Sequence, residues 1–321
     1  MTTPPALLIA AQGTRDEAGA EAFRALIREL RRRNPGLPVA GGFTDRSAPP
    51  LTDAVSELVE QGVRRLAAVP LTLVSAGQTG HAGDSVPAAL AREQERHPGV
   101  AYRYGRPLGA HPKVLAVLER RLEEALGERA RKPSDRAGTT VLLVGGGSTD
   151  AGANAEVHRA ARLLWEGRGF AGVETAFVSL AAPDVPSGLD RCVRLGARRI
   201  VVLPYFLFTG GLPERVRMQT EGWAAAHPEV DVLPAEVIGS AEELADAVME
   251  RYREAVEGGD GDSGTSCASC SDRGASPVSE GEGARPEQPL EHPADESGDH
   301  DHRRHGPEGG DHLHGGHAHA R

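Results

Sequence analysis

Cysteine is scarce in this chain of 321 residues, which contains only Cys192, Cys267 and Cys270. Three cysteines do not suggest the disulfide framework on which small secreted domains depend. The first residues, MTTPPALLIAAQG, carry no basic segment ahead of their apolar run, so we expect no signal peptide. The sequence therefore predicts a cytoplasmic protein.

Long apolar runs and aromatic residues are scarce as well. The apolar runs have the length of strands, so we expect no membrane-spanning segment and no membrane partner. Aromatic residues make up 4% of the chain, and no basic stripe is interleaved with them, which argues against nucleic-acid binding. Alanine, valine and leucine must then do most of the packing, as in layered α/β proteins.

Lysine is scarce too, so arginine and the acidic residues determine how charge is distributed along the chain. Lys113 and Lys132 are the only lysines, so nearly all positive charge is arginine, whose fork suits carboxylates and phosphates. The net charge is −10, but the segment from Glu257 onward has fourteen acids and five arginines, a net −9. The first 256 residues are thus close to neutral, and the acidity belongs to the C-terminal segment.

An internal repeat organises the neutral part. The stretch Leu7–Thr14 recurs as Val141–Ser148, 134 residues later. One spacing then holds over some seventy residues, which indicates two copies of one unit. The positions that it pairs include Asp16 with Asp150, Phe23 with Val157, Leu30 with Leu164, Phe43 with Phe177, Pro49 with Pro183, and Pro70 with Pro204.

In each copy, short apolar runs of strand length alternate with longer stretches of helical periodicity. This alternation predicts parallel sheets with right-handed crossovers. In the first copy we expect strands at 7–11, 39–43, 66–73 and 100–104, and helices at 17–33, 51–61, 84–96 and about 112–126. The predicted fold is two tandem duplicated βα domains, each a small parallel sheet flanked by helices. They should span 1–130 and 139–256.

The segment 257–321 is rich in glycine, serine, proline and acids, and it has few apolar residues, so we expect a disordered tail. It holds eight of the thirteen histidines and the pair Cys267 and Cys270. The cysteines could join an Fe–S cluster or a zinc site, or be an unstructured thiol pair. The histidines should bind divalent metals at least weakly; His312, His314, His317 and His319 form His-x-His pairs.

The chemical centre is expected at His81, in Gly80-His81-Ala82, after the third buried strand. Open α/β sheets place their sites at the carboxyl ends of strands, where this histidine should lie. Gly145–Gly147 lacks the spacing of a phosphate-binding loop, so we interpret it as a tight strand-to-helix turn.

The two-copy pattern resembles the CbiX/SirB-type sirohydrochlorin chelatases over about residues 5–256. The similarity lies in Gly13-Thr14-Arg15-Asp16, in the stretch from Val69 to Pro87, in Tyr102–Gly109 with His111-Pro112, and in Ala161–Gly169 and Val202–Gly210. It implies a chelatase-like fold and the insertion of Co²⁺ or Fe²⁺, or Ni²⁺, into sirohydrochlorin for sirohaem or cobalamin. A homodimer is left open.

The resemblance also implies roles for single residues. In such chelatases a histidine after the first strand pairs with the one after the third strand to hold the metal, but here Gln12 takes that position. His81 is the expected metal ligand and catalytic base, with Gln12 as a weaker metal contact or merely a turn residue. Independently of the resemblance, Thr14 and Arg15, with the backbone of their turn at a helix N-terminus, are expected to contact substrate carboxylates. His111 either contacts substrate or caps a helix.

Imidazole suits this chemistry because it binds Co²⁺, Fe²⁺ and Ni²⁺ and titrates near neutral pH. Glutamine offers only a carbonyl oxygen and accepts no proton. Two functions therefore remain open at this point: a chelatase that depends on His81, or a catalytically weakened relative that binds and delivers a tetrapyrrole or metal.

Overall fold

The computed structural model describes residues 4–12, 16–45, 47–74, 86–239 and 241–258. Several predicted features lie outside these ranges: the tail from residue 259, the turn residues Thr14 and Arg15, and His81. None of the described helices is long and apolar enough to cross a membrane.

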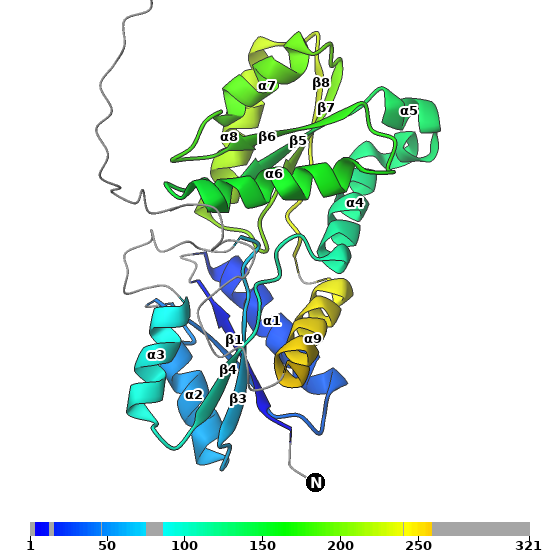
Figure 1. Ribbon diagram of the computed structural model, residues 1–321. Helices are drawn as coiled ribbons and strands as arrows, with labels where there is room; N and C mark the ends of the chain where they lie inside the picture. The colour runs from blue at the N-terminus through cyan, green and yellow to red at the C-terminus, as the bar shows by residue number, and fades with distance from the viewer. Residues whose placement is uncertain (1–3, 13–15, 46, 75–85, 240, 259–321) are drawn as a thin grey trace, which may run out of the picture. The chain divides into compact units, whose positions relative to one another are not determined.

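The described chain alternates strands and helices, as predicted (Figure 1). The first copy comprises β1 (Ala6–Ala11), α1 (Glu17–Arg33), β2 (Val39–Phe43), α2 (Leu51–Glu60), β3 (Arg65–Pro70), α3 (Val86–Arg96), β4 (Ala101–Tyr104) and α4 (Pro112–Leu126). A 3₁₀ turn, η1 (Gly127–Arg131), and α5 (Pro133–Ala137) connect the copies. The second copy comprises β5 (Thr140–Gly145), α6 (Ala151–Trp165), β6 (Gly172–Phe177), α7 (Val185–Arg194), β7 (Arg199–Pro204), α8 (Gly211–Ala226), β8 (Asp231–Pro234) and α9 (Glu242–Glu257).

The strands form two four-stranded parallel sheets, which confirms the predicted fold class. Their orders are β2-β1-β3-β4 and β6-β5-β7-β8. The order changes direction between β1 and β3, and again between β5 and β7. Such switch points are where open α/β sheets leave room for a ligand.

The strand register confirms the duplication residue by residue. Leu7 pairs with Val39 and Ala67, and Val141 pairs with Val173 and Val201, all 134 positions later. The fourth strands follow a different spacing: β4 begins at position 101 and β8 at position 231, which is 130 later. The second copy is thus four residues shorter between its third and fourth strands.

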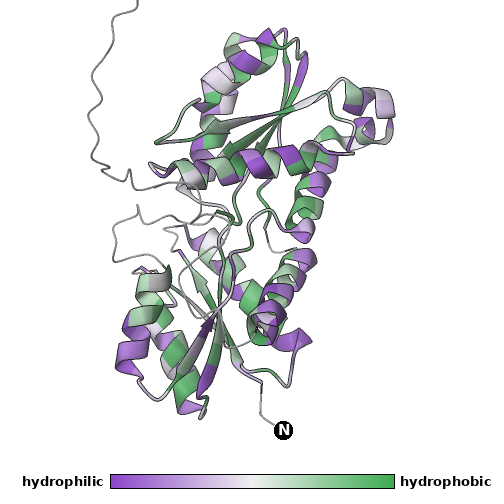
Figure 2. Ribbon diagram, in the orientation of Figure 1, coloured by the Kyte–Doolittle hydropathy of each residue, from purple (hydrophilic) through white to green (hydrophobic). Residues whose placement is uncertain are grey.

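Helix α1 illustrates why the predicted helices form. Phe23, Leu26, Ile27 and Leu30 recur at helical spacing and are all buried, so the helix has one face for the sheet. Asp16 caps it by accepting a hydrogen bond from the Gly19 N–H at 3.0 Å. Asp150 caps α6 in the same way through the Gly152 N–H at 2.8 Å. Figure 2 shows both hydrophobic and hydrophilic residues on these helices, as amphipathic packing requires.

The last helix of each copy packs against the other copy. Helix α4 follows β4 in the chain but contacts β7, β8 and α6, while α9 follows β8 but contacts β3, β4 and α1 (Figure 1). The Arg121 side chain on α4 donates to the carbonyls of Val237 and Ile238, both at 2.9 Å. On α9, the Tyr252 hydroxyl donates to the Pro5 carbonyl at 2.6 Å. The predicted ranges 1–130 and 139–256 therefore divide the chain by sequence. In the packed structure, α4 of the first range lies on the second sheet, and α9 of the second range lies on the first sheet.

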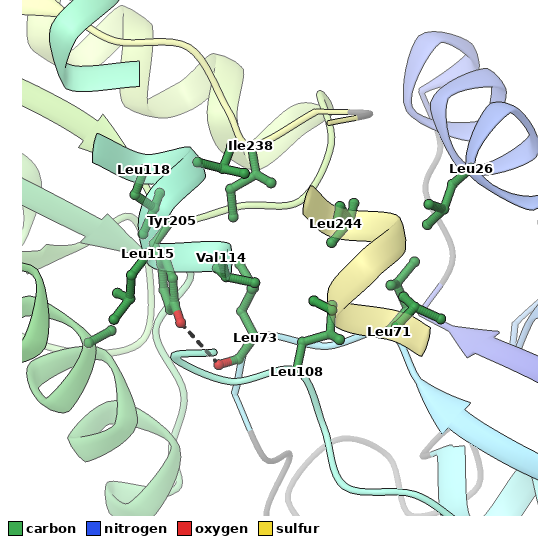
Figure 3. Packing of buried hydrophobic residues seen from close by; sticks show 14 of the residues in the cluster. Leu26, Leu71, Leu73, Leu108, Val114, Leu115, Leu118, Tyr205, Ile238 and Leu244 are labelled. Carbon is green, nitrogen blue, oxygen red and sulfur yellow. Dashed lines mark hydrogen bonds between the residues drawn. The ribbon is translucent and has the colours of Figure 1, made fainter. Parts of the chain in front are cut away.

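This exchange produces a buried hydrophobic cluster that includes residues from both copies. Figure 3 shows its middle, where leucines from the segments after β3 and β4 meet α4, α9 and Tyr205. Two smaller clusters cover the other faces of the sheets. Because one core joins both sheets, we expect the two copies to unfold together.

Candidate functional site

The loops after β1, β2 and β3 leave the first sheet side by side at its switch point. The Ala10 carbonyl accepts a hydrogen bond from the Leu71 N–H at 2.8 Å, and the Ala11 carbonyl accepts one from the Thr44 N–H at 2.9 Å. Gln12 is the next residue and is exposed. The structure thus brings the predicted metal contact to the edge where the segment after β3 begins.

The segment after β3 can be followed as far as Val74, seven residues before His81. Leu71 and Leu73 are buried in the shared core, and the Leu73 carbonyl lies 3.4 Å from the Tyr205 hydroxyl (Figure 3). Tyr205 directly follows β7, so a residue of the second copy contacts the chain that leads toward His81. The position of His81 itself remains a prediction.

His111 is the predicted site histidine that the structure describes in full. It is the N-cap of α4, where its Nδ1 accepts a hydrogen bond from the Lys113 N–H at 3.2 Å. Its Nε2 lies 3.1 Å from a carboxylate oxygen of Glu250 on α9, and the residue is only 5% exposed. The neutral ring with a proton on Nε2 satisfies both contacts.

Electrostatics also favour the neutral form of His111. Burial lowers the pKa of the imidazole, and the positive charge of Arg251 lowers it further, against the opposing effect of Glu250. The described geometry gives His111 a capping role between the exchanged helices. Contact of His111 with substrate stays a prediction.

The loop after β7 is tied to the start of α1. The Thr209 hydroxyl donates to the Asp16 carboxylate at 2.7 Å, and this bond is the largest cause of the lowered pKa of Asp16. Thr209 belongs to the Val202–Gly210 stretch on which the family resemblance rests, but nothing in that pattern assigns it a partner 193 residues away. The loop after β7 therefore contacts the N-cap of α1.

The second sheet has no ligand-type side chain at the equivalent place. Gly146 is the counterpart of Gln12 by the 134-residue spacing, and Gly147 has φ of +83°. A Cβ at Gly147 would lie 1.7 Å from the Ser179 carbonyl oxygen, so only glycine fits. This geometry bears out the tight strand-to-helix turn predicted there.

Within the described ranges, no three histidine, cysteine or acidic side chains gather in a way that could hold a metal ion. The predicted cluster ligands Cys267 and Cys270, and His312, His314, His317 and His319, lie beyond residue 258 and outside those ranges. The metal of the predicted reaction would be a substrate, which needs a transient site rather than a permanent one.

Comparison with known proteins places this geometry in context. A sirohydrochlorin cobaltochelatase of Priestia megaterium is 32% identical over 253 residues, covering 78% of this chain and 80% of the relative. A sirohydrochlorin ferrochelatase of the same organism is also 32% identical, over 67% of this chain and 78% of the relative.

The solved structure of SirB from Bacillus subtilis subspecies spizizenii in complex with cobalt has the same fold. It superposes with a TM-score of 0.65 at 23% identity and covers 81% of this chain and 98% of SirB. The CbiX family profile matches residues 6–125 and again 140–255, which are the two copies seen in the sheets. This chain therefore belongs to the CbiX family.

Proposed function

We propose that this protein is a sirohydrochlorin chelatase that inserts Co²⁺ or Fe²⁺ into the tetrapyrrole. The observation that carries the proposal is the 32% identity to a cobaltochelatase over 80% of that enzyme's length. The ferrochelatase relative has the same identity over a shorter stretch, 218 residues, so the proposal covers both metals, with Ni²⁺ as a third candidate. The product would serve sirohaem or cobalamin biosynthesis in the cytoplasm.

The chemistry requires a base and a weak metal ligand. Two pyrrole N–H protons must leave while the ion moves into four nitrogens. A neutral imidazole has one free lone pair, so it can first hold a borderline ion and then, once the ion has moved to the pyrrole nitrogens, accept one of the two protons, while the other passes to water. General-base assistance is typically worth about 10²–10⁴-fold. We assign both tasks to His81. Thr14 and Arg15, in the turn after β1, would bind the carboxylates of the substrate, and His111 is a weaker candidate for substrate contact.

The placement of Gln12 supports this assignment. It is exposed at the β1 end of the switch point, and hydrogen bonds join the first residues after β3 to β1 there. Its amide oxygen could contact the ion but could not accept a proton. In this proposal His81 is the side chain that accepts a pyrrole proton.

The presence of glutamine also favours the second candidate function, a catalytically weakened relative that binds a tetrapyrrole or metal and delivers it. The tail would buffer the ion in either case, through His312, His314, His317 and His319. Cys267 and Cys270 would add an Fe–S or zinc site, across a homodimer or with tail histidines.

The test is anaerobic insertion of Co²⁺ and of Fe²⁺ into sirohydrochlorin, followed by absorbance. We expect a rate above background that His81→Ala abolishes and Gln12→His raises. His97→Ala is the matched control, because His97 follows α3 at the far end of that helix and should leave the rate unchanged. A wild-type rate equal to background with both metals would leave only the binding and delivery function.

A further inference from the structure

The carboxyl edges of the two sheets differ at equivalent positions. Gln12 presents a polar side chain after β1, whereas its counterpart Gly146 presents none after β5. A Cβ placed on Gly146 would have ordinary contacts, 3.8 Å from both Leu212 Cδ1 and Phe206 Cε1. An alanine would fit there, so steric conflict does not explain the missing side chain.

Apolar side chains lie beside the turn at Gly146. The Gly146 carbonyl accepts hydrogen bonds from the Ser179 N–H at 3.2 Å and the Ser179 hydroxyl at 3.1 Å, which brings the loop after β6 against it. The next residue, Leu180, is 74% exposed, and Leu212 is 43% exposed. We call Leu180, Phe206 and Leu212 the apolar edge; Phe206 is partly buried.

Leu180 has an unusual backbone as well as an exposed side chain. Its φ is +59°, and among the described residues it is the one non-glycine with positive φ. A bulky aliphatic residue is disfavoured there, where asparagine or glycine would fit better. Neither burial nor backbone preference accounts for leucine at this position. Strained residues of this kind cluster at ligand sites.

The loop that carries Phe206 also contacts the first copy. Phe206 and Phe208 lie in the loop after β7, between Tyr205, which contacts the Leu73 carbonyl, and Thr209, which binds Asp16. These two contacts fix the loop against the segments that follow β3 and β1. Arg215, exposed in the first part of α8, adds positive charge close to Leu212 in the sequence.

We propose that the apolar edge binds one face of the macrocycle, an inference that rests on the proposed function. A tetrapyrrole is flat and apolar over its ring, with carboxylates at its periphery. The apolar edge suits the ring, and Arg215 suits a peripheral carboxylate. The second copy would thus hold the ring while the first copy delivers the metal, which explains why the ligand-type residue occurs only once.

The test uses Leu180→Asn in the full chain. Asparagine tolerates positive φ and has a similar size, so the fold should keep or gain thermal stability. Binding of metal-free sirohydrochlorin, followed anaerobically by fluorescence, should weaken about tenfold, the scale expected for a leucine side chain that becomes buried. KM should rise in proportion, and kcat at saturation should change less than about twofold.

Leu195→Asn is the control, because Leu195 is 67% exposed but lies at the end of α7, away from the carboxyl edge. It should bind as the wild type does. Leu180→Gly should repeat the effect of Leu180→Asn, since glycine also accepts the backbone. If both Leu180 variants bind sirohydrochlorin as the wild type does and still insert the metal, the ring-binding role of the apolar edge is wrong, but the proposed function stands. A wild-type chain that neither binds nor metallates sirohydrochlorin would instead overturn the proposed function.

Discussion

The two copies share strand order and register but differ where each chain leaves its sheet. After β1 and β3 the first copy has Gln12 and a long connection that contains His81. After β5 and β7 the second copy has a glycine turn and a connection of six residues, Tyr205–Gly210, that leads directly into α8. The sheets are buried and tolerate little change, whereas their carboxyl edges have diverged. Duplication thus preserved the scaffold, while the side chains at its two carboxyl edges became different.

The largest expected effect concerns the glycine turn of the second copy. Gly147→Ala places a methyl group 1.7 Å from the Ser179 carbonyl oxygen at a φ of +83°. We expect a loss of more than about 4 kcal/mol in the free energy of unfolding, because backbone must move and the conformation disfavours a side chain. Urea denaturation measures this change in the free energy of unfolding. Gly146→Ala, one residue earlier, would make only ordinary contacts at 3.8 Å and should cost less than about 1 kcal/mol. Equal losses for the two variants would mean that the turn is not held as described.

The exchanged helices provide the next test, because they should make the two copies inseparable in stability. Leu118 on α4 and Leu244 on α9 are both fully buried in the shared cluster. Each Leu→Ala change should cost about 3 kcal/mol. Both variants should still unfold in one transition that circular dichroism and tryptophan fluorescence report identically; Trp165 and Trp223 both belong to the second copy. Separate transitions would show that each sheet unfolds with its own helices.

The N-caps of the exchanged helices differ in a way that pH should reveal. His111 caps α4, whereas Ala241 precedes α9 and supplies no side-chain cap. The pKa of His111 is lowered in the folded protein, so below about pH 6.5 the unfolded chain binds more protons at this residue and stability falls. The charged groups that act on the ring are Glu250, Arg251 and Glu254 on α9, and Lys113 on α4.

Replacement by asparagine separates this titration from the cap itself. Asparagine is a good N-cap but does not titrate, so His111→Asn should lose less stability between pH 7 and pH 5 than the wild type does. Denaturant midpoints at several pH values provide the measurement. Parallel curves for the two proteins would remove His111 from the acid sensitivity of the fold.

The smallest expected effect on the fold comes from removing the tail. Helix α9 ends at Glu257, and Arg103 donates hydrogen bonds to the carbonyls of Val256 and Gly258. A chain that ends at Gly258 keeps these contacts, so its melting temperature should change by less than about 2 °C. Metal analysis after equilibration with Co²⁺ should find fewer bound ions than in the full chain. If the shortened and full chains bind the same number of ions, the ions are not bound by the tail.

Much of the site lies beyond what local patterns can predict. The sequence correctly placed Gln12 directly after a buried strand, because a strand and its carboxyl end are local features. It did not reveal that Thr209 binds Asp16 or that Leu180 is exposed at positive φ, because both depend on loops that meet only in the folded chain. The sequence leaves His111 as either a substrate contact or a helix cap. In the structure it caps α4, and its Nε2 lies beside the Glu250 carboxylate of α9.

The sequence alone determined the duplication and the parallel βα units, because the 134-residue spacing and the alternation of apolar runs with helical periodicity are both visible in the chain itself. Strand order and register came from the structure. Tertiary structure decided which sheet each terminal helix covers and where the two edges meet. The apolar face of α4 would suit either sheet, since the duplicated sheets present equivalent apolar surfaces. Only the packing of the whole chain selects between them.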